Sequence, residues 1–194
     1  EKLYYKAFYN EWLDFYDQVT ELIGIDIKSV FEIGCGSGVN LYMFQKRNNC
    51  EVGGDYSASM IESAKIVTGF DDFTCCGADA ISVKHQYDIV MSESVFQYFE
   101  SLEYAESVLR KMIEKSTKLT YLGEIHNAKY EQELMEMRKR TIADYEQIYQ
   151  GLSKLFFEKN WINKIAEEYG KKVVYTKVNN PEYINGRYLF NCYI

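Results

Sequence analysis

The sequence predicts a single α/β domain in which helices cover both faces of a seven-stranded, mostly parallel sheet. Three observations support this prediction. Short apolar runs alternate with longer amphipathic ones, the rhythm changes near the end of the chain, and three glycines in five positions follow the first apolar run. Strands and helices that alternate in this way are typical of a parallel sheet with right-handed crossovers.

The parallel part of the sheet is predicted from five short apolar runs. They lie at 29–33, 50–54, 72–76, 87–92 and 118–125. Near-continuous apolar runs of this length are typical of strands that are buried on both faces. Apolar residues at helical spacing predict the intervening helices at 39–47, 57–68 and 102–115.

The end of the chain departs from this alternation. A polar helical stretch is predicted at 129–149, and a further helix at 156–170 ends at a glycine. Two strands are predicted at 171–178 and 187–194, joined by the turn-rich run NNPEYING. Because no helix separates them, the last strand is expected to run antiparallel to its neighbour at the edge of the sheet.

Composition and charge disfavour several classes of partner. The formal net charge of −7 disfavours nucleic acids, whose binding depends on cationic side chains that neutralise phosphates. No apolar run approaches the roughly 18 residues that span a bilayer, so we expect a cytoplasmic protein without a membrane partner. Five cysteines without a C-x-x-C pair, and only two histidines, favour reduced thiols and no metal site.

The glycine run FEIGCGSGVN, at 31–40, indicates a ligand site. A glycine turn between a first strand and a first helix lets a ligand approach the backbone at the helix N-terminus. A dinucleotide fingerprint would have its third glycine at position 39, where this chain has Val39. The spacing therefore argues against a nicotinamide-dependent dehydrogenase.

The motifs together resemble the class I, Rossmann-like methyltransferases that depend on S-adenosylmethionine (SAM). Glu32 precedes a G-x-G-x-G run, acidic residues follow the second and third strands, and YDIVMSESVFQYF matches the family's fourth motif. The resemblance covers about 30–124 and extends more loosely to the end of the chain. It implies SAM as cofactor and S-adenosylhomocysteine as product.

The resemblance also implies where SAM binds. Its methionine part is expected to approach the backbone of Gly34, Cys35 and Gly36, with Glu32 pairing through water with the ammonium group. In the fourth motif, Ser92 is expected to emerge over the cofactor.

The nucleoside is expected at the carboxyl ends of the second and third strands. Asp55 would accept both ribose hydroxyls, and Tyr56 and Met60 would lie along the adenine faces. Asp79 would take the adenine amino group, and the backbone of Ala80 a ring nitrogen. Two alternatives are simpler: Asp55 caps the next helix, and Tyr56 and Met60 only pack in the core.

Candidate bases stand at the carboxyl ends of the fourth and fifth strands. His126 has a side chain that ordinarily titrates near neutrality, and Glu93 and Glu124 compete with it for this role. Asp88, at the opposite end of the fourth strand, is expected to be structural, and Gln97 to orient the acceptor.

The acceptor pocket is expected to have walls outside the cofactor core, which we place at 29–125. An aromatic-rich helix at 1–28, carrying Tyr5 and Tyr9, would fold over the cofactor as a lid or simply pack on the sheet. A helical insertion at 126–157, carrying Tyr149, would form another wall, and Arg187 would come from the final helix and strand pair at 158–194.

We expect methyl transfer to an oxygen of a small-molecule acceptor, by a monomer or homodimer. The run IYQGLSKLFFEKNW resembles small methyltransferases of bacterial capsule polysaccharide biosynthesis, including the kind that methylate a phosphoramidate. An anionic phosphoramidate or phosphate needs no base but favours cations such as Arg187, Lys154, Lys129 or protonated His126. A sugar or phenolic hydroxyl needs a base. An N-methyltransferase of a small amine and a non-catalytic SAM-binding subunit are the alternatives.

Overall fold

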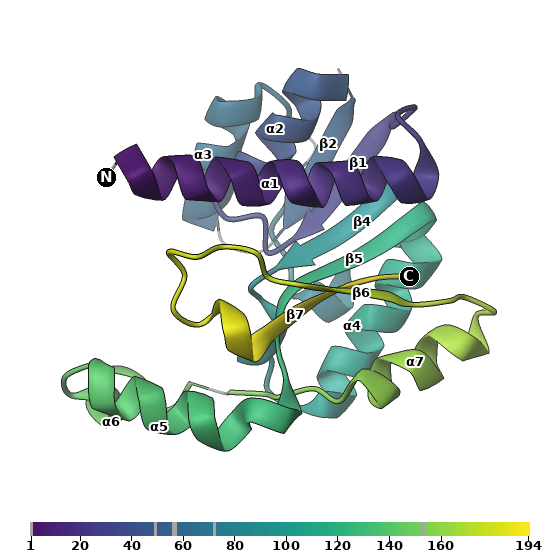
Figure 1. Ribbon diagram of the computed structural model, residues 1–194. Coiled ribbons are helices and arrows are strands. Elements are labelled where there is room, and N and C mark those ends of the chain that lie inside the picture. Colours follow the sequence, from purple (N-terminus) through teal and green to yellow (C-terminus); the bar gives the residue numbers. More distant parts are fainter. Residues whose placement is uncertain (1, 49, 56–57, 72, 153) are drawn as a thin grey trace.

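The structure is a computed structural model that describes residues 2–48, 50–55, 58–71, 73–152 and 154–194. One seven-stranded sheet has the strand order β3-β2-β1-β4-β5-β7-β6. Figure 1 shows this sheet with helices on both faces, α1 crossing one face and α4 and α7 lying on the other. The predicted α/β fold, with an antiparallel last strand, is confirmed.

The first five strands are parallel and the last is antiparallel to both of its neighbours. The strands are β1 (Ser29–Ile33), β2 (Glu51–Asp55), β3 (Phe73–Thr74), β4 (Tyr87–Glu93), β5 (Ser116–His126), β6 (Val174–Lys177) and β7 (Leu189–Tyr193). β7 pairs with β5 on one side and with β6 on the other. The strand order reverses at β1, which lies between β2 and β4, and such a switch point is where parallel sheets bind ligands.

Seven α-helices are formed by the described residues. They are α1 (Lys2–Ile23), α2 (Val39–Asn48), α3 (Ala58–Thr68), α4 (Leu102–Lys115), α5 (Glu131–Thr141), α6 (Tyr145–Ile148) and α7 (Lys159–Glu168). Apolar side chains of α1, α2 and α3 form one core against the sheet, and those of α4 and α7 form a second core on the other face. Along β4, Ile89 and Met91 enter the first core and Val90 the second, as the two-residue period of a strand requires.

The insertion after β5 is the largest departure from the predicted elements. Instead of one helix over 129–149, the chain forms a short 3₁₀ turn at Ala128–Tyr130, then α5, then α6. Asp144, between the two helices, adopts the left-handed conformation with φ 54°, which a continuous helix does not allow. The insertion is therefore bent, and α6 is only one turn long (Figure 1).

Three other boundaries differ from the prediction. The third strand is shorter than 72–76, since β3 contains only Phe73 and Thr74 and position 72 lies outside the described residues. The helix predicted at 156–170 begins later, because the 154–157 segment runs in extended form beside the end of β5 and Asn127 pairs with Phe157. The predicted last strand begins with a 3₁₀ turn at Gly186–Tyr188.

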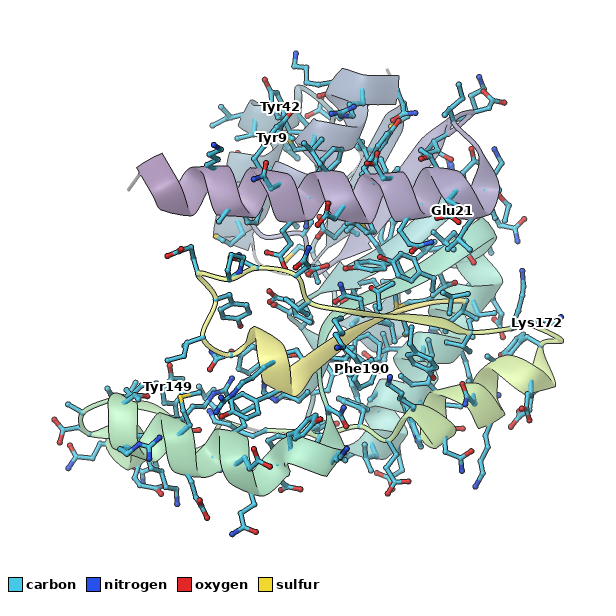
Figure 2. All side chains as sticks on the ribbon, viewed as in Figure 1. Tyr9, Glu21, Tyr42, Tyr149, Lys172 and Phe190 are labelled. Atoms are coloured by element: carbon cyan, nitrogen blue, oxygen red, sulfur yellow. The ribbon has the colours of Figure 1, made fainter. Side chains whose placement is uncertain are left out.

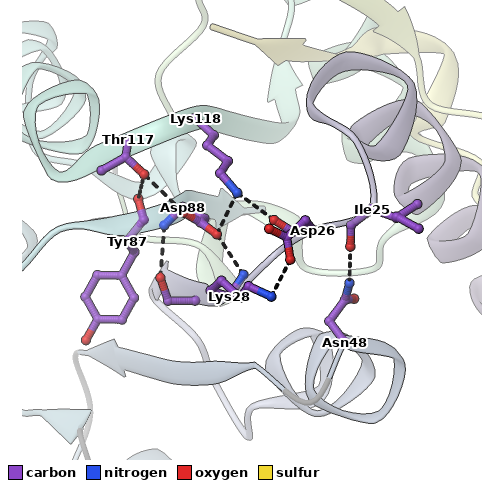
Figure 3. A network of polar contacts seen from close by, with 9 residues as sticks. Ile25, Asp26, Lys28, Asn48, Tyr87, Asp88, Thr117 and Lys118 are labelled. Atoms are coloured by element: carbon purple, nitrogen blue, oxygen red, sulfur yellow. Dashed lines mark hydrogen bonds and ion pairs between the residues drawn. The ribbon is translucent and has the colours of Figure 1, made fainter.

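The amino-terminal ends of β4 and β5 are held by a polar network around Asp88 (Figure 3). One carboxylate oxygen of Asp88 accepts from the Lys28 backbone N–H at 2.7 Å and from Lys118 Nζ at 3.0 Å, and the other accepts from Thr117 Oγ1 at 3.2 Å. Lys28 also pairs with Asp26. This network is at the opposite end of the strands from the glycine turn, so the structural role predicted for Asp88 agrees with its contacts.

None of the helices in the described ranges is both long enough and apolar enough to cross a bilayer.

Candidate functional site

Two cavities open at the carboxyl edge of the sheet, one polar and one apolar. The polar cavity, about 500 Å³, is lined by Phe8, Glu11, Trp12, Asp14, Phe15, Gln18, Asn40, Met91, Glu93, Ser94, Tyr121, Glu124, Thr176, Lys177, Asn179, Asn180, Tyr183, Asn191 and Tyr193. The apolar cavity, about 560 Å³, is lined by Ile33, Gly34, Gly36, Met60, Ala78, Val95, Tyr98, Phe99, Glu100 and Tyr104. Both volumes are in the range of small-molecule sites.

The glycine turn forms one wall of the apolar cavity. Gly34 and Gly36 have φ angles of 71° and 53°, in the left-handed region that other residues rarely adopt. A Cβ atom on Gly34 would lie 2.5 Å from Val95 Cγ2, so the turn and the segment after β4 pack at a distance that only glycine allows. Met60, from α3, lies opposite, with its Cε 3.7 Å from the Cβ position of Gly36.

The residues around Glu32 connect the glycine turn to the polar cavity. Glu32 is 2% exposed, and its Oε1 accepts a hydrogen bond from Asn40 Nδ2 at 2.8 Å. Asn40, near the start of α2, lines the polar cavity. Cys35 is buried and packs against β2, where a Cβ on Gly54 would lie 2.6 Å from its sulfur. The prediction for Cys35 concerned its backbone, and its side chain has this packing role.

The structure describes only some of the residues that are predicted to contact the nucleoside. Asp79 is exposed beside the apolar cavity, where its Oδ1 accepts from the Tyr104 hydroxyl at 3.0 Å. The Ala80 N–H donates to the Gly77 carbonyl at 2.8 Å, so the amide predicted to reach an adenine nitrogen is engaged within its own turn. Asp55 ends β2, but its side chain, like all of Tyr56, lies outside the described residues.

Ser92 and Gln97, which the sequence predicts as site residues, are buried and line neither cavity. Ser92 is 1% exposed, and its hydroxyl donates to the Ile33 carbonyl at 3.2 Å, which ties β4 to the glycine turn. Gln97 is also buried, and its Nε2 donates to the Ser94 carbonyl at 2.8 Å. These contacts position the backbone around the cavities.

Glu93 lies at the end of β4 and lines the polar cavity. Its carboxyl group occupies the space beside Gly123 of β5, where there is no side chain. A Cβ on Gly123 of β5 would overlap the Glu93 carboxyl group, so only glycine leaves room for it. The Tyr121 hydroxyl donates a hydrogen bond to the same carboxyl group. Burial raises the pKa of Glu93 well above its usual range, and repulsion from Glu124 adds to this rise.

Glu124 faces the same cavity from β5 in an unusual backbone conformation. Its φ is 53° and that of Ser94, after β4, is 56°. The Ser94 hydroxyl donates to the Glu124 carboxylate, and the Glu124 N–H donates to Asn191 Oδ1 at 2.9 Å. Non-glycine residues in this region of φ cost about 1–3 kcal/mol each and are found most often at functional sites.

Glu124 has the titration behaviour of a base that operates near neutral pH. Burial raises its pKa from 4.5 to about 7, and the charge of Glu11 adds to the rise. A carboxyl group whose pKa is close to the working pH is suited to accept a proton during a reaction.

The raised pKa of Glu124 predicts a pH-dependent stability. The folded chain favours the neutral form of the Glu124 carboxyl group. The contribution of this group to the free energy of unfolding is therefore fully present below pH 4.5 and is lost as the pH rises through about 7. The Glu124→Gln variant should therefore show a smaller fall in the free energy of unfolding between pH 5 and pH 8, with a difference of up to about 3 kcal/mol. Urea titrations at both pH values measure this, with Glu131→Gln on the exposed start of α5 as control. Equal slopes for wild type and Glu124→Gln would contradict the prediction.

His126 does not line the polar cavity that Glu93 and Glu124 line. It ends β5, is 2% exposed, and its Nε2 lies 3.1 Å from Arg138 of α5. Burial and the charge of Arg138 lower the pKa of His126 to about 4. The neutral form of His126 is therefore favoured at pH 7, which argues against the expectation that its protonated form assists an anionic acceptor.

Helix α1 and the segment between β6 and β7 form the outer walls of the polar cavity. Phe8, Glu11, Trp12 and Phe15 lie on one face of α1 and line the cavity, while Trp12 and Phe15 also belong to the core. Helix α1 is therefore packed on the sheet, as one of the two expected descriptions has it, and it also borders the polar cavity. Its action as a lid over the cofactor stays a prediction.

The β6–β7 segment is fastened to α1 by two side-chain hydrogen bonds. Asn179 Nδ2 donates to Asp14 at 2.9 Å, and Asn180 Nδ2 donates to Glu11 at 2.8 Å. Tyr183 completes this wall.

Several residues predicted to bind the acceptor line neither cavity. Tyr9 is 45% exposed and lies on the side of α1 opposite the β6–β7 segment (Figure 2), and the Tyr5 side chain is outside the described residues. Tyr149 is at the end of α6 (Figure 2), and Arg187 is exposed and donates to the Tyr188 hydroxyl. None of the described residues of the insertion at 126–157 lines either cavity, whereas the end of β6 and the β6–β7 segment contribute Lys177, Asn179, Asn180 and Tyr183 to the polar one.

Sequence reasoning missed Glu11, Asn180 and Tyr183, which carry no motif of their own. The sequence does contain one feature that indicates the close approach of Glu93 to β5. Gly123 interrupts the apolar run TYLGEI, and a glycine inside a strand often marks a close approach by another group.

The central part of the chain is similar to a known protein family. Residues 31–117, from β1 to the start of β5, match the family model of the methyltransferase domain. The fold is that of a class I methyltransferase.

Two curated relatives and one solved structure illustrate the similarity of this methyltransferase fold. The chain is 32% identical over 131 residues to the nonribosomal peptide synthetase dtxS1 of Metarhizium robertsii, covering 61% of the chain and 2% of that protein. It is 30% identical over 97 residues to the malonyl-[acyl-carrier protein] O-methyltransferase of Priestia megaterium, covering 48% of the chain and 35% of that protein. The chain thus spans a small part of the first relative and about a third of the second.

The solved structure is CalS10, an amino pentose methyltransferase from Micromonospora echinaspora, with SAM bound. It superposes with a TM-score of 0.67 at 13% identity, covering 97% of this chain and 95% of CalS10. At this identity the likeness concerns the fold alone. It extends beyond the matched domain to nearly the whole chain, including the antiparallel edge of the sheet.

Proposed function

We propose that this chain is a SAM-dependent methyltransferase that acts on a small-molecule acceptor held in the polar cavity. The observation that carries this proposal is the arrangement of the two cavities, which border the glycine turn and its buried Glu32–Asn40 pair. The match of residues 31–117 to the methyltransferase domain supports it.

The residues present fit SAM. The apolar cavity, with Met60 and Tyr104 in its lining and Asp79 beside it, suits an adenosyl group. The buried carboxylate of Glu32 and the amide of Asn40 suit the amino-acid end, which carries an ammonium group. When bound, SAM supplies a methyl group that its sulfonium activates for direct displacement.

The protein's own contribution is to position the acceptor and to remove a proton from it. Glu124 would accept the proton, and the Ser94 hydroxyl holds its carboxylate toward the cavity. Glu93, whose raised pKa favours the neutral carboxyl group, would orient the acceptor by hydrogen bonding. Trp12 is 4% exposed, and its Nε1 has no hydrogen-bond partner among the described residues, so it is placed to donate to an acceptor oxygen.

Oxygen is the acceptor atom that the sequence predicts, on a sugar or on a phosphate or phosphoramidate. Glu124 as base favours a neutral hydroxyl among these. A role in capsule polysaccharide biosynthesis stays a prediction from the sequence.

A small amine is the second candidate acceptor, and the charge of the polar cavity favours it. Four carboxyl groups line this cavity, those of Glu11, Asp14, Glu93 and Glu124, against the single cation Lys177. A protonated amine would pair with the ionised carboxylates among these groups and donate a hydrogen bond to the neutral carboxyl group of Glu93. Transfer of its proton to Glu124 would expose the nitrogen lone pair. The comparison with CalS10 is consistent with this candidate but does not choose between the two atoms.

Methyl transfer from labelled SAM tests the proposal directly. Acceptors should be offered as matched hydroxyl and amine pairs, such as glucose 6-phosphate and glucosamine 6-phosphate, with release of S-adenosylhomocysteine as the readout. We expect calorimetry to show SAM binding and no NAD binding. Binding of NAD but not SAM would refute the proposal, whereas SAM binding without turnover on any acceptor would favour a non-catalytic subunit.

A further inference from the structure

Two cationic side chains, Arg138 and Lys154, lie near the end of β5 and the α5–α6 insertion. Arg138 and Lys154 are both half-buried, and neither forms an ion pair with a carboxylate in the described part of the chain. Partly buried cations without counter-ions are costly unless a ligand supplies the negative charge.

The chain holds both cations in place with specific contacts. Arg138 Nη2 lies 3.1 Å from His126 Nε2, and since the low pKa of His126 leaves it neutral, this nitrogen accepts the bond. Lys154 Nζ lies 3.9 Å from the centre of the Tyr149 ring and 5.3 Å from that of Tyr145. A guanidinium group has five N–H donors, so a single bond to His126 leaves Arg138 with capacity for an oxyanion.

The position of Lys154 follows from backbone pairing between two segments. The Phe157 N–H donates to the His126 carbonyl at 2.8 Å, and the Ala128 N–H donates to the Phe157 carbonyl at 3.0 Å. This pairing lays the 154–157 segment along the end of β5, and the Phe156 ring packs over His126 at 5.0 Å between centroids. Lys154 is thereby brought close enough to His126 and Arg138 for their charges to affect one another.

Electrostatic effects on nearby groups support a close grouping of charges. Burial and the Arg138 charge lower the pKa of Lys154, and both cations act to lower the pKa of His126. Tyr183 lines the polar cavity, and burial raises its pKa to about 12. The charge of Glu124 adds to this rise and the charge of Arg138 opposes it, so Tyr183 is within electrostatic reach of both.

We propose that Arg138 and Lys154 form an oxyanion site that holds a phosphate or similar anionic group of the methyl acceptor. The acceptor would extend past Tyr183, with its reacting atom near Glu124 and its anionic group between the two cations. This inference rests on the proposed function only in assigning the anion to the acceptor. Tyr149, predicted to bind the acceptor, would act here by fixing Lys154.

Calorimetric titration at low ionic strength tests the site with inorganic phosphate, glucose 6-phosphate and glucose as probes. We expect glucose 6-phosphate to bind at least about tenfold more tightly than glucose, because hydrogen bonds to charged groups are strong. Arg138→Gln and Lys154→Gln should each weaken phosphate and glucose 6-phosphate about tenfold or more. Arg140→Gln, at an exposed position of the same helix, should leave both affinities unchanged.

Three results would overturn the proposal. They are the absence of phosphate binding by the wild type, an equal loss in Arg140→Gln, and binding of phosphate without binding of glucose 6-phosphate. SAM titration of every variant serves as the folding control, and Lys154→Gln keeps the test valid if Arg138→Gln does not fold. If the wild type bound phosphate at Arg138 but did not bind SAM, the oxyanion site would stand and the proposed function would fail.

Discussion

Replacement of Glu124 by glutamine is expected to lower kcat by about 10²–10⁴-fold on an acceptor that must lose a proton. The side chain keeps its size and a hydrogen-bonding oxygen for Ser94, but it no longer accepts a proton. In the wild type, kcat should rise with pH and level off above about 7, the pKa of Glu124, because only the ionised carboxylate is a base. The variant should show no such rise.

The measurement is methyl transfer from labelled SAM, between pH 5.5 and pH 9, on the best acceptor found. Glu131→Gln, at an exposed position outside the site, is the matched control. An unchanged kcat in Glu124→Gln would contradict the assignment of the base and indicate an acceptor that is already anionic. Retained SAM binding would show that any loss concerns the transfer step.

Replacement of Gly34 by alanine is expected to weaken SAM binding by about 100-fold or more. Two costs act together: the φ of 71° disfavours any side chain, by roughly 1–2 kcal/mol, and the new Cβ would lie 2.5 Å from Val95 Cγ2. To relieve this contact the turn must move away from the segment after β4, which changes the shape of the apolar cavity.

Gly69→Ala provides a control with the same backbone cost and no contact. Gly69 has a φ of 73°, and nothing lies within 4 Å of its Cβ position. Calorimetry with SAM should therefore give a wild-type dissociation constant for Gly69→Ala, although thermal unfolding shows a loss of stability. If Gly34→Ala bound SAM as tightly as Gly69→Ala does, the cofactor role of this turn would be refuted.

The strands and the glycine turn could be predicted from sequence because their signals are local. An apolar run of five residues and three closely spaced glycines are sufficient to place β1, the turn and the start of α2. Glu93 and Glu124 could also be placed at the cavity, since each stands at or near the carboxyl end of a predicted strand.

The outer part of the site could not be predicted, because it depends on contacts between distant residues. Asn179 and Asp14 are 165 positions apart, and Asn180 and Glu11 are 169 apart, so neither pair gives a periodic or motif signal. The same applies to His126, whose pKa is lowered by burial and by the charge of Arg138, a residue in the insertion whose position the sequence did not indicate.

These two hydrogen bonds join helix α1 to the segment between β6 and β7, two parts of the chain that are far apart in sequence. The apolar cavity is lined mainly by residues of neighbouring strand–turn–helix units, whereas the outer wall of the polar cavity forms only when α1 meets the β6–β7 segment, which imposes the larger loss of chain entropy. Folding can therefore complete the apolar cavity before the polar cavity. Under the proposed function, substitutions in α1 or in the β6–β7 segment would change the choice of acceptor and leave the cofactor site unaltered.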